Sequence, residues 1–314
     1  MSTILLVIAG WDPEAWLARF RALGGGREVR LWPDVGDPAN IDYACVWKPP
    51  AGLFATLPCL RAIFSLGAGV DHLIEDVALP AVPIVRIVDS NLTRRMTEYV
   101  VLHVLLHHRR MKLYEAQQHA RQWRDDIERP ASEVRVGILG MGVLGRAAAE
   151  ALVQIGFRVA GWSRSRKSIP GVETFAGKTE LRRFLARTDI LVCMLPLTPA
   201  TRGLLSYDLF RGLARDGVLG APALINAGRG GLQVEVDILR ALDDGTLIGA
   251  SLDVFETEPL PPASPFWTHA KVYVTPHNAA QSDPQALVAN VLAQIERHER
   301  GLPLEHIIDR KLGY

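Results

Sequence analysis

The sequence predicts an α/β protein with doubly wound parallel sheets, and three observations lead to this. Short apolar segments rich in β-branched residues alternate with helical segments along the chain. One apolar segment runs straight into a glycine-rich turn that opens a helix. The length, 314 residues, suits two domains better than one. We therefore expect two such domains.

The glycine-rich turn follows a strand that begins at Val134 and precedes a helix over residues 146–155, in the pattern G-x-G-x-x-G. Gly140 makes the tight turn, Gly142 lets the backbone approach a pyrophosphate, and Gly145 lets the helix pack close to the strand. The start of the helix adds N–H groups and the positive end of the helix dipole. This pattern predicts a dinucleotide site. The expected cofactor contacts are Gly140, Gly142, Val143, Leu144 and Gly145.

The other elements follow from apolar periodicity and turn residues. In the first domain we expect strands at residues 3–9, 28–31, 43–47, 63–66 and 83–88, and a helix at 13–23. A long helix without glycine or proline is expected from Met96 to about Gln122. Later strands are expected at 158–162, 190–195, 223–226, 248–254 and 272–275, with helices within 201–213 and at 236–242. A terminal helix after Pro284 should return to the first domain.

Composition excludes several classes of protein. With a formal net charge of +1 and 22% charged residues, nucleic acid and anionic membrane are poor electrostatic partners. No apolar run has the length of a membrane span, and the apolar start lacks the basic region of a signal peptide. Cys45, Cys59 and Cys193 lie apart in apolar contexts, which fits reduced, buried thiols. We expect a cytoplasmic protein.

The long helix carries His103, His107 and His108. Histidines four apart on a helix can bind zinc. No Glu-x-x-His arrangement accompanies them, and this helix face is apolar. The sequence therefore favours packed histidines, and we expect no metal.

Three candidate chemical groups follow successive strands. Arg229, Glu258 and His277 should share the edge at which parallel strands end, where ligands of such sheets bind. Each residue alone has an ordinary alternative: a turn cap, a solvated carboxylate or a loop histidine. Together they form a coherent set, because a carboxylate beside a histidine favours the imidazolium. That imidazolium can protonate a carbonyl oxygen while a guanidinium polarises the carbonyl and grips a neighbouring carboxylate.

A second glycine-rich turn follows the expected strand at residues 63–66. The N–H groups of Ala68 and Gly69 can hold an anion such as a carboxylate. An ordinary strand-to-helix turn explains the same residues equally well.

Taken together, these motifs resemble the D-isomer-specific 2-hydroxyacid dehydrogenases, particularly the glyoxylate/hydroxypyruvate reductase A branch. The resemblance covers nearly the whole chain. It rests on residues 46–50, 66–71, 137–145, 162–168, 226–229, 252–255, 258–262 and 275–277.

The resemblance implies roles for the candidate residues. Arg229 would bind substrate, His277 would be the acid/base and Glu258 its partner. The backbone of Ala68 and Gly69 would receive the substrate carboxylate. Further implied contacts are Asp253 near the nicotinamide ring, Trp47 near the substrate pocket, and Trp123 approaching from a neighbouring subunit. Asn278, after His277, departs from many relatives.

The resemblance also implies a homodimer with a discontinuous domain. Residues 1–98 and 284–314 would form the substrate domain, and residues 99–283 would form an inserted Rossmann domain that binds NAD(P).

The residues after the expected strand at 158–162 favour NADP(H) over NAD(H). NAD enzymes place an acidic residue here to accept from the ribose 2′-hydroxyl. This chain has Ser163 and Arg164, followed by Arg166 and Lys167. No acid repels a 2′-phosphate, and Arg164 with Arg166 or Lys167 can bind one.

The sequence thus favours an NADPH-dependent reductase of glyoxylate or hydroxypyruvate. One alternative is a reductase of larger 2-oxo acids, since pocket shape depends on loops. Another is a nucleotide-sensing binding protein, like the corepressor relatives of the family. Formate dehydrogenases share the fold, but they carry a glutamine beside the histidine, and Glu258 argues against them.

Overall fold

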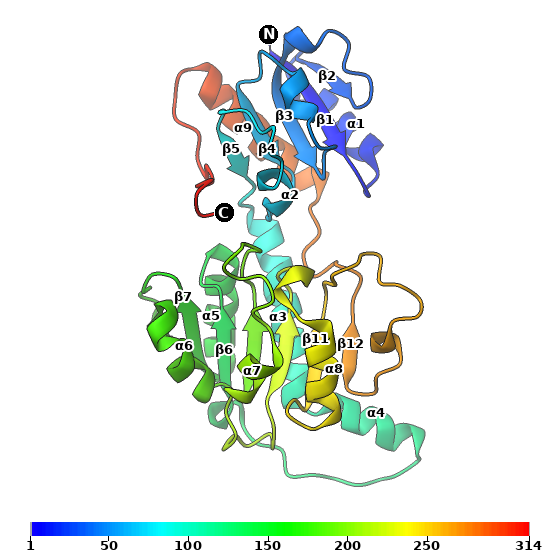
Figure 1. Cartoon of the computed structure of the whole chain (residues 1–314), viewed down its shortest axis with the longest axis vertical. Coiled ribbons are helices and arrows are strands. Elements are labelled where there is room, and N and C mark those ends of the chain that lie inside the picture. The colour runs from blue at the N-terminus through cyan, green and yellow to red at the C-terminus, as the bar shows by residue number, and fades with distance from the viewer. Residues whose placement is uncertain (1, 314) are drawn as a thin grey trace. The chain divides into compact units, whose positions relative to one another are not determined.

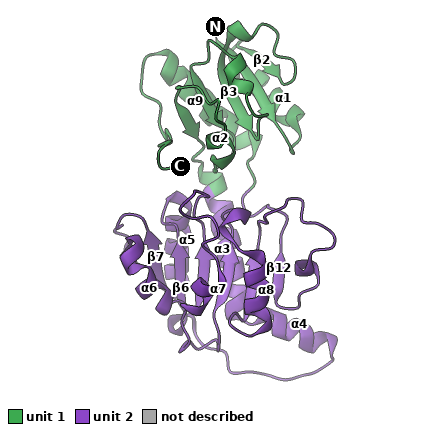
Figure 2. Ribbon diagram, viewed as in Figure 1, with its two compact units in different colours: residues 1–92, 281–314 green, residues 93–280 purple. Residues whose placement is uncertain are grey.

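The computed structural model describes residues 2–313 and divides the chain into two compact units (Figures 1 and 2). Unit 1 comprises Met1–Leu92 and Gln281–Tyr314, and unit 2 comprises Thr93–Ala280. The second unit is therefore inserted into the chain of the first.

Unit 1 contains a 5-stranded parallel sheet in the order β2-β1-β3-β4-β5. The order reverses between β1 and β3, as in doubly wound folds. The strands are β1 (Thr3–Ile8), β2 (Glu28–Leu31), β3 (Ile41–Trp47), β4 (Ala62–Ser65) and β5 (Ile84–Arg86). The helices are α1 (Pro13–Leu23), α2 (Asp71–Ile74) and α9 (Pro284–Glu299).

Both faces of the unit 1 sheet are covered. Because side chains alternate along a strand, Ile4 and Leu6 of β1 face one cluster and Leu5 and Val7 face the other. The first cluster includes side chains of α1 and α9. Each of these helices begins with an aspartate followed by proline, and Asp12 accepts the N–H of Glu14 at 3.0 Å. The C-terminal helix thus completes the core of the N-terminal strands.

Unit 2 contains a 7-stranded parallel sheet in the order β12-β11-β10-β9-β6-β7-β8, which reverses between β6 and β9. The strands are β6 (Arg135–Leu139), β7 (Arg158–Ser163), β8 (Glu173–Ala176), β9 (Ile190–Cys193), β10 (Ala223–Asn226), β11 (Gly249–Leu252) and β12 (Val272–Val274). The helices are α3 (Ser90–His108), α4 (Met111–His119), α5 (Val143–Ile155), α6 (Gly177–Ala186), α7 (Tyr207–Arg211) and α8 (Glu235–Asp243).

Two apolar clusters enclose the unit 2 sheet. Strand β9 contributes Leu191 and Cys193 to one cluster and Ile190 and Val192 to the other. A strand covered on both faces needs apolar side chains at every position, which explains its uninterrupted apolar sequence. The predicted fold class, two doubly wound parallel-sheet domains, is confirmed.

The single long helix expected from Met96 to about Gln122 was wrong. Helix α3 ends at His108, and α4 begins at Met111. Between them Arg110 has a φ of 53°, which a right-handed helix cannot include. Its guanidinium pairs with Asp126 at 3.3 Å. No glycine or proline marks the break, so tertiary contacts rather than local propensity decide it.

The expectation that all three cysteines are buried was also wrong. Cys59 is exposed, in the turn before β4. Its neighbours Leu57 and Leu60 are buried, so the turn places the cysteine outward. Cys45 and Cys193 are buried, and burial raises the pKa of the Cys193 thiol to about 12.

The histidines of α3 pack against the strands of unit 2. Nδ1 of His103 and Nε2 of His107 each lie 2.8 Å from the hydroxyl of Ser251 on β11, and His108 packs edge-on against Phe157. Burial lowers the pKa of His103 to about 4 and that of His107 to about 3. Among the described residues, no group of three or more His, Cys, Asp or Glu is arranged to hold a metal ion.

Because His103 and His107 are buried as neutral groups, we expect the protein to lose stability in mild acid. The unfolded chain binds a proton on each histidine near pH 6.5, whereas the folded chain keeps both neutral until far lower pH. Stability should therefore fall as the pH drops below about 6.5. Thermal unfolding at about pH 7 and about pH 5 tests this. From the higher to the lower pH, the His107→Gln variant should lose less thermal stability than the wild type. An equal loss in both proteins would contradict the prediction.

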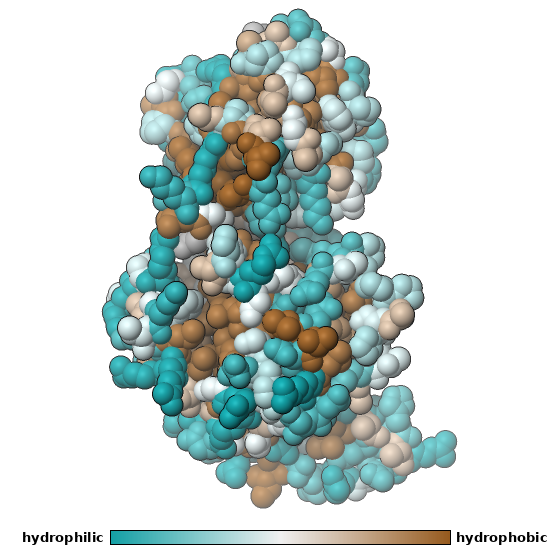
Figure 3. Space-filling model, in the orientation of Figure 1, coloured by the Kyte–Doolittle hydropathy of each residue, from teal (hydrophilic) through white to brown (hydrophobic). Residues whose placement is uncertain are grey.

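On the face of the molecule shown in Figure 3, hydrophobic residues are interspersed with hydrophilic ones. Across residues 2–313, no helix combines the length and the apolar character that crossing a membrane requires.

Candidate active site

His277 and Glu258 form a hydrogen-bonded pair beyond the carboxyl ends of β11 and β12. Nδ1 of His277 lies 2.8 Å from Oε2 of Glu258, and both side chains are half-buried. The other carboxylate oxygen accepts the N–H of Phe255 at 3.2 Å. A carboxylate held in this way fixes the orientation of the imidazole. The arrangement leaves Nε2 as the ring nitrogen suited to exchange a proton with a ligand.

The loop that carries His277 is tied to Asp253. This carboxylate is 2% exposed, and it accepts the hydroxyl of Thr275 at 2.7 Å and the N–H groups of Asn278 and Ala279 at 2.9 and 3.0 Å. The backbone N–H of His277 donates to the Asp253 carbonyl at 2.8 Å. Burial raises the pKa of Asp253, while these hydrogen bonds oppose the rise. Asp253 therefore holds the histidine loop, and its contact with a nicotinamide ring stays a prediction.

Arg229 lies on the loop after β10. The buried amide of Asn226 donates to the Arg229 carbonyl at 3.2 Å and to the Gln233 side chain at 2.9 Å, and its oxygen accepts the N–H of Gly228 at 3.1 Å. A Cβ on Gly230 would lie 1.9 Å from the Phe255 carbonyl, so the arginine loop packs directly against the segment that leads to Glu258. This contact brings Arg229 to the same edge of the sheet as the His277–Glu258 pair.

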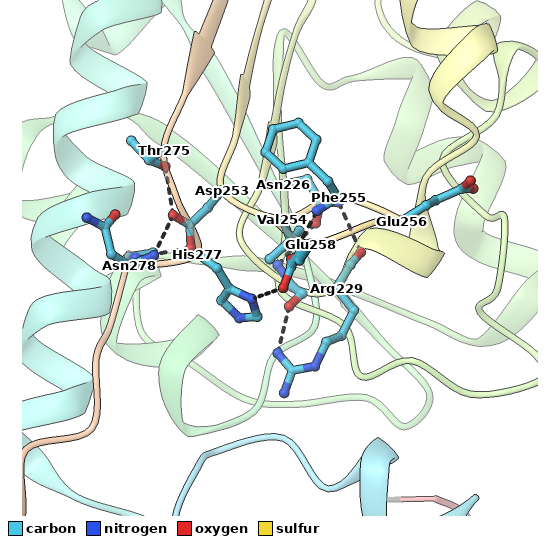
Figure 4. A network of polar contacts seen from close by, with 12 residues as sticks. Asn226, Arg229, Asp253, Val254, Phe255, Glu256, Glu258, Thr275, His277 and Asn278 are labelled. Carbon is cyan, nitrogen blue, oxygen red and sulfur yellow. Dashed lines mark hydrogen bonds and ion pairs between the residues drawn. The ribbon is translucent and has the colours of Figure 1, made fainter. Parts of the chain in front are cut away.

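Figure 4 shows the result. The imidazole of His277 and the guanidinium of Arg229 both point away from the strands on the same side, with Glu258 between their loops. A proton donor and a fixed cation in this arrangement suit a substrate that carries a carbonyl and an anionic group.

Sequence reasoning missed the residues that hold this arrangement. Gln233 donates to the Val254 carbonyl at 3.0 Å, and Thr275 bridges Asp253 to the Tyr99 hydroxyl at 2.9 Å. Asn226 and Thr275 carry one sequence signal, a polar residue at or just after the end of an apolar strand, whereas Gln233 lies beyond the strand and has no such signal.

The glycine turn between β6 and α5 has the geometry of a phosphate-binding loop. Gly140 has a φ of 104°, and a Cβ on Gly145 would lie 1.9 Å from the Gly140 carbonyl. A Cβ on Gly142 would meet nothing within 4 Å, so open space adjoins the start of α5. The backbone here fits the close approach of a dinucleotide pyrophosphate. Val143 and Leu144, the first residues of α5, lie at this helix start.

Comparison with known proteins places the chain in a family. The family model described as D-isomer specific 2-hydroxyacid dehydrogenase, NAD binding domain, matches residues 101–279. The glyoxylate/hydroxypyruvate reductase A of Serratia proteamaculans is 41% identical over 310 residues, which cover 97% of each chain. The chain belongs to the D-isomer specific 2-hydroxyacid dehydrogenases.

Two solved structures of such dehydrogenases are similar over their full length. One is the NADPH-dependent glyoxylate/hydroxypyruvate reductase of Sinorhizobium meliloti in complex with NADP and sulfate, with 51% identity, 100% coverage of both chains and a TM-score of 0.96. The other is a D-isomer specific 2-hydroxyacid dehydrogenase of Xanthobacter autotrophicus with NADPH and MES, with 40% identity, 100% coverage of both chains and a TM-score of 0.94.

In this dehydrogenase, the loop after β7 carries the residues predicted to bind the cofactor phosphate, and their side chains make different contacts. The hydroxyl of Ser163 donates to the Ser165 carbonyl at 2.8 Å. Arg166 donates from Nη2 to both oxygens of Glu180, at 2.6 and 2.7 Å. Arg164 and Lys167 lie on the same exposed loop. No pattern in the sequence indicated that Glu180 contacts this loop.

The predicted substrate residues of unit 1 gather around the end of β4. The Trp47 ring is 8% exposed, and a Cβ on Gly67 would lie 2.1 Å from it. Ala68 and Gly69 are half-buried, and the hydroxyl of Ser65 donates to the carbonyls of Gly67 and Gly69 at 3.0 and 3.2 Å. These contacts fix the turn. Trp123, by contrast, is fully exposed on the segment after α4.

Proposed function

We propose that this protein is an NADPH-dependent reductase that converts glyoxylate to glycolate and hydroxypyruvate to D-glycerate. The observation that carries the proposal is the 2.8 Å pair of His277 and Glu258, beside the Arg229 loop and on a unit whose glycine turn fits a dinucleotide. The relatives named above, and the cofactors in their structures, support the same choice.

When bound, NADPH supplies the hydride that is added to the carbonyl carbon of the 2-oxo acid. His277 donates the proton from Nε2 to the carbonyl oxygen, and the Glu258 carboxylate stabilises the imidazolium before this transfer. The Arg229 guanidinium polarises the carbonyl and pairs with the substrate carboxylate. The sum is 2-oxo acid, NADPH and a proton giving 2-hydroxy acid and NADP⁺. The His277 imidazole then regains its proton from solvent.

In unit 1, the backbone N–H groups of Ala68 and Gly69 would receive the substrate carboxylate. Their turn is fixed by Ser65 and by the Trp47 ring, as an anion site needs. The Trp47 ring would line the substrate pocket.

We further propose a cytoplasmic homodimer. Free cysteines fit a reducing compartment. On the segment after α4, Trp123 and Ile127 are 103% and 83% exposed, and on α3 Leu102 is 53% exposed, which fits a covered surface in a dimer. Trp123 would then approach the active site of the partner subunit. Because the net charge is near neutral, nucleic acid is a poor electrostatic partner, and we propose no nucleic-acid ligand.

A panel of 2-oxo acids tests the proposed activity. NADPH oxidation should be fastest with glyoxylate or hydroxypyruvate, and NADH should be a poorer cofactor. Faster turnover of larger 2-oxo acids would favour the alternative pocket. Tight NADPH binding without oxidation by any 2-oxo acid would point to a nucleotide-sensing protein instead.

The proposed 2′-phosphate contact of Arg164 gives a separate prediction. Arg164→Asp should weaken NADPH binding by roughly 30-fold, because a charge-assisted contact becomes a repulsion. NADH binding should change by less than about threefold, since NADH lacks the phosphate. Fluorescence titration measures both. The matched control is Arg158→Asp, the same charge change at the opposite end of β7. Equal losses for NADPH and NADH would reject the assigned contact.

A further inference from the structure

The guanidinium of Arg166 forms hydrogen bonds with other residues of the chain and is not directed only toward solvent. Nη1 donates to the Thr174 carbonyl of β8 at 2.7 Å, and Nη2 donates to both oxygens of Glu180 on α6. Three hydrogen bonds from one guanidinium join the loop after β7 to the next strand and the next helix. Contacts from both terminal nitrogens of one planar guanidinium restrain its direction as well as its distance.

Further hydrogen bonds fix the same loop. The Thr174 hydroxyl donates to the Lys167 carbonyl at 2.8 Å, next to the Arg166 contact, and the Ser163 hydroxyl closes a short turn on Ser165. Glu180 is itself anchored, because Oε2 accepts the N–H of Ala176 at 2.6 Å. The loop backbone from residue 163 to residue 167 is thus tied at both ends.

The pairing also changes the charge that the loop presents. The Ala176 N–H and the Arg166 guanidinium hold the pKa of Glu180 below its usual range, so the carboxylate is charged at neutral pH. Its charge offsets that of Arg166. The same loop also carries Arg164 and Lys167.

We infer that Arg166 and Glu180 form a clamp that positions the loop of residues 163–167 for the 2′-phosphate of NADPH, and that Arg166 is not itself a phosphate ligand. The inference rests on the proposed NADPH dependence. Glu180 is accordingly a positioning residue for cofactor selectivity. This revises the direct role that the sequence suggested for Arg166.

The clamp and a direct role for Arg166 predict opposite effects of Glu180→Gln. Glutamine keeps an oxygen for the Ala176 N–H but removes the charge that pairs with Arg166. If Arg166 is part of a clamp, the loop loosens and NADPH binds less tightly. If Arg166 binds the phosphate directly, it is released from a competing carboxylate and NADPH binds more tightly.

The test measures dissociation constants by fluorescence titration for NADPH, NADH and adenosine 2′,5′-bisphosphate, without turnover. Glu180→Gln should weaken NADPH and the bisphosphate by about fivefold and NADH by less than about twofold, as expected for loss of one exposed ion pair. Arg166→Met should give the same result. The double variant should be no weaker than either single variant, because both disable one clamp. Glu296→Gln, which breaks the ion pair between Glu296 on α9 and Arg300 just after this helix, is the control and should change nothing.

Hydrogen exchange adds a readout that needs no cofactor. Amides of residues 163–176 should exchange faster in both clamp variants than in the wild type. NADPH binding that is unchanged or tighter in Glu180→Gln would overturn the clamp and leave the proposed reductase standing. A wild-type protein that binds NADPH no tighter than NADH would overturn the proposed cofactor, and with it the role of the clamp in selectivity.

Discussion

His277→Gln is expected to lower kcat for glyoxylate reduction by about a thousandfold, within the range that general acid catalysis supplies. Glutamine retains hydrogen-bonding groups but has no titratable proton to give to the carbonyl oxygen. NADPH binding should change little, because the proposed cofactor contacts lie on the glycine turn and the loop after β7. Steady-state rates and fluorescence titration of NADPH separate the two effects.

A second histidine of unit 2 provides the control. His269 lies 3.4 Å from Asp243, so His269→Gln also removes a histidine beside a carboxylate, away from the proposed site. Its kcat should stay near that of the wild type. Near-normal turnover in His277→Gln would remove His277 from the mechanism.

Arg229→Lys is expected to lower kcat/KM for glyoxylate by about a hundredfold or more. Lysine keeps the positive charge but cannot form the paired, planar hydrogen bonds that a guanidinium makes with a carboxylate and a carbonyl. The loss should lie in both KM and kcat, because the same group binds the substrate and stabilises the transition state. The dissociation constant for NADPH should not change.

The matched control for this variant is Arg215→Lys. The Arg215 guanidinium donates to the carbonyls of Phe210 and Thr246 at 2.7 and 2.8 Å, so it has a structural role in the same unit. This control should affect thermal stability rather than KM. If both variants instead reduced activity to the same extent, the loss in Arg229→Lys could not be attributed to a contact between Arg229 and the substrate.

The parts of this protein that sequence predicts well are those encoded locally. The glycine turn at Gly140–Gly145 can be recognised because its glycines lie in one short segment, where Gly140 has a positive φ and a Cβ on Gly145 would collide with the Gly140 carbonyl. The apolar strand β9 can be recognised because both of its faces are buried. The fold class and the family inferred from such segments are confirmed.

Features that depend on residues far apart in the chain were not predicted. The break after His108 has no local signal, and Arg110 reaches to Asp126 across a loop. Arg166 and Glu180 are 14 positions apart, so the sequence did not indicate that they pair. The whole basic loop was therefore interpreted as phosphate-binding, although one of its arginines pairs with Glu180. The ties from Asp253 to the histidine loop likewise join two strand ends that only the folded sheet brings together.

Transfer of deuterium is the most direct test of the central claim, that this chain moves a hydride from NADPH to a 2-oxo acid. The protein is incubated with hydroxypyruvate and NADPH labelled with deuterium on the transferred position of C4, and the product is examined by NMR. We expect D-glycerate with deuterium on C2 in amounts equal to the NADPH consumed. Unlabelled glycerate, or consumption of NADPH without glycerate, would contradict the account.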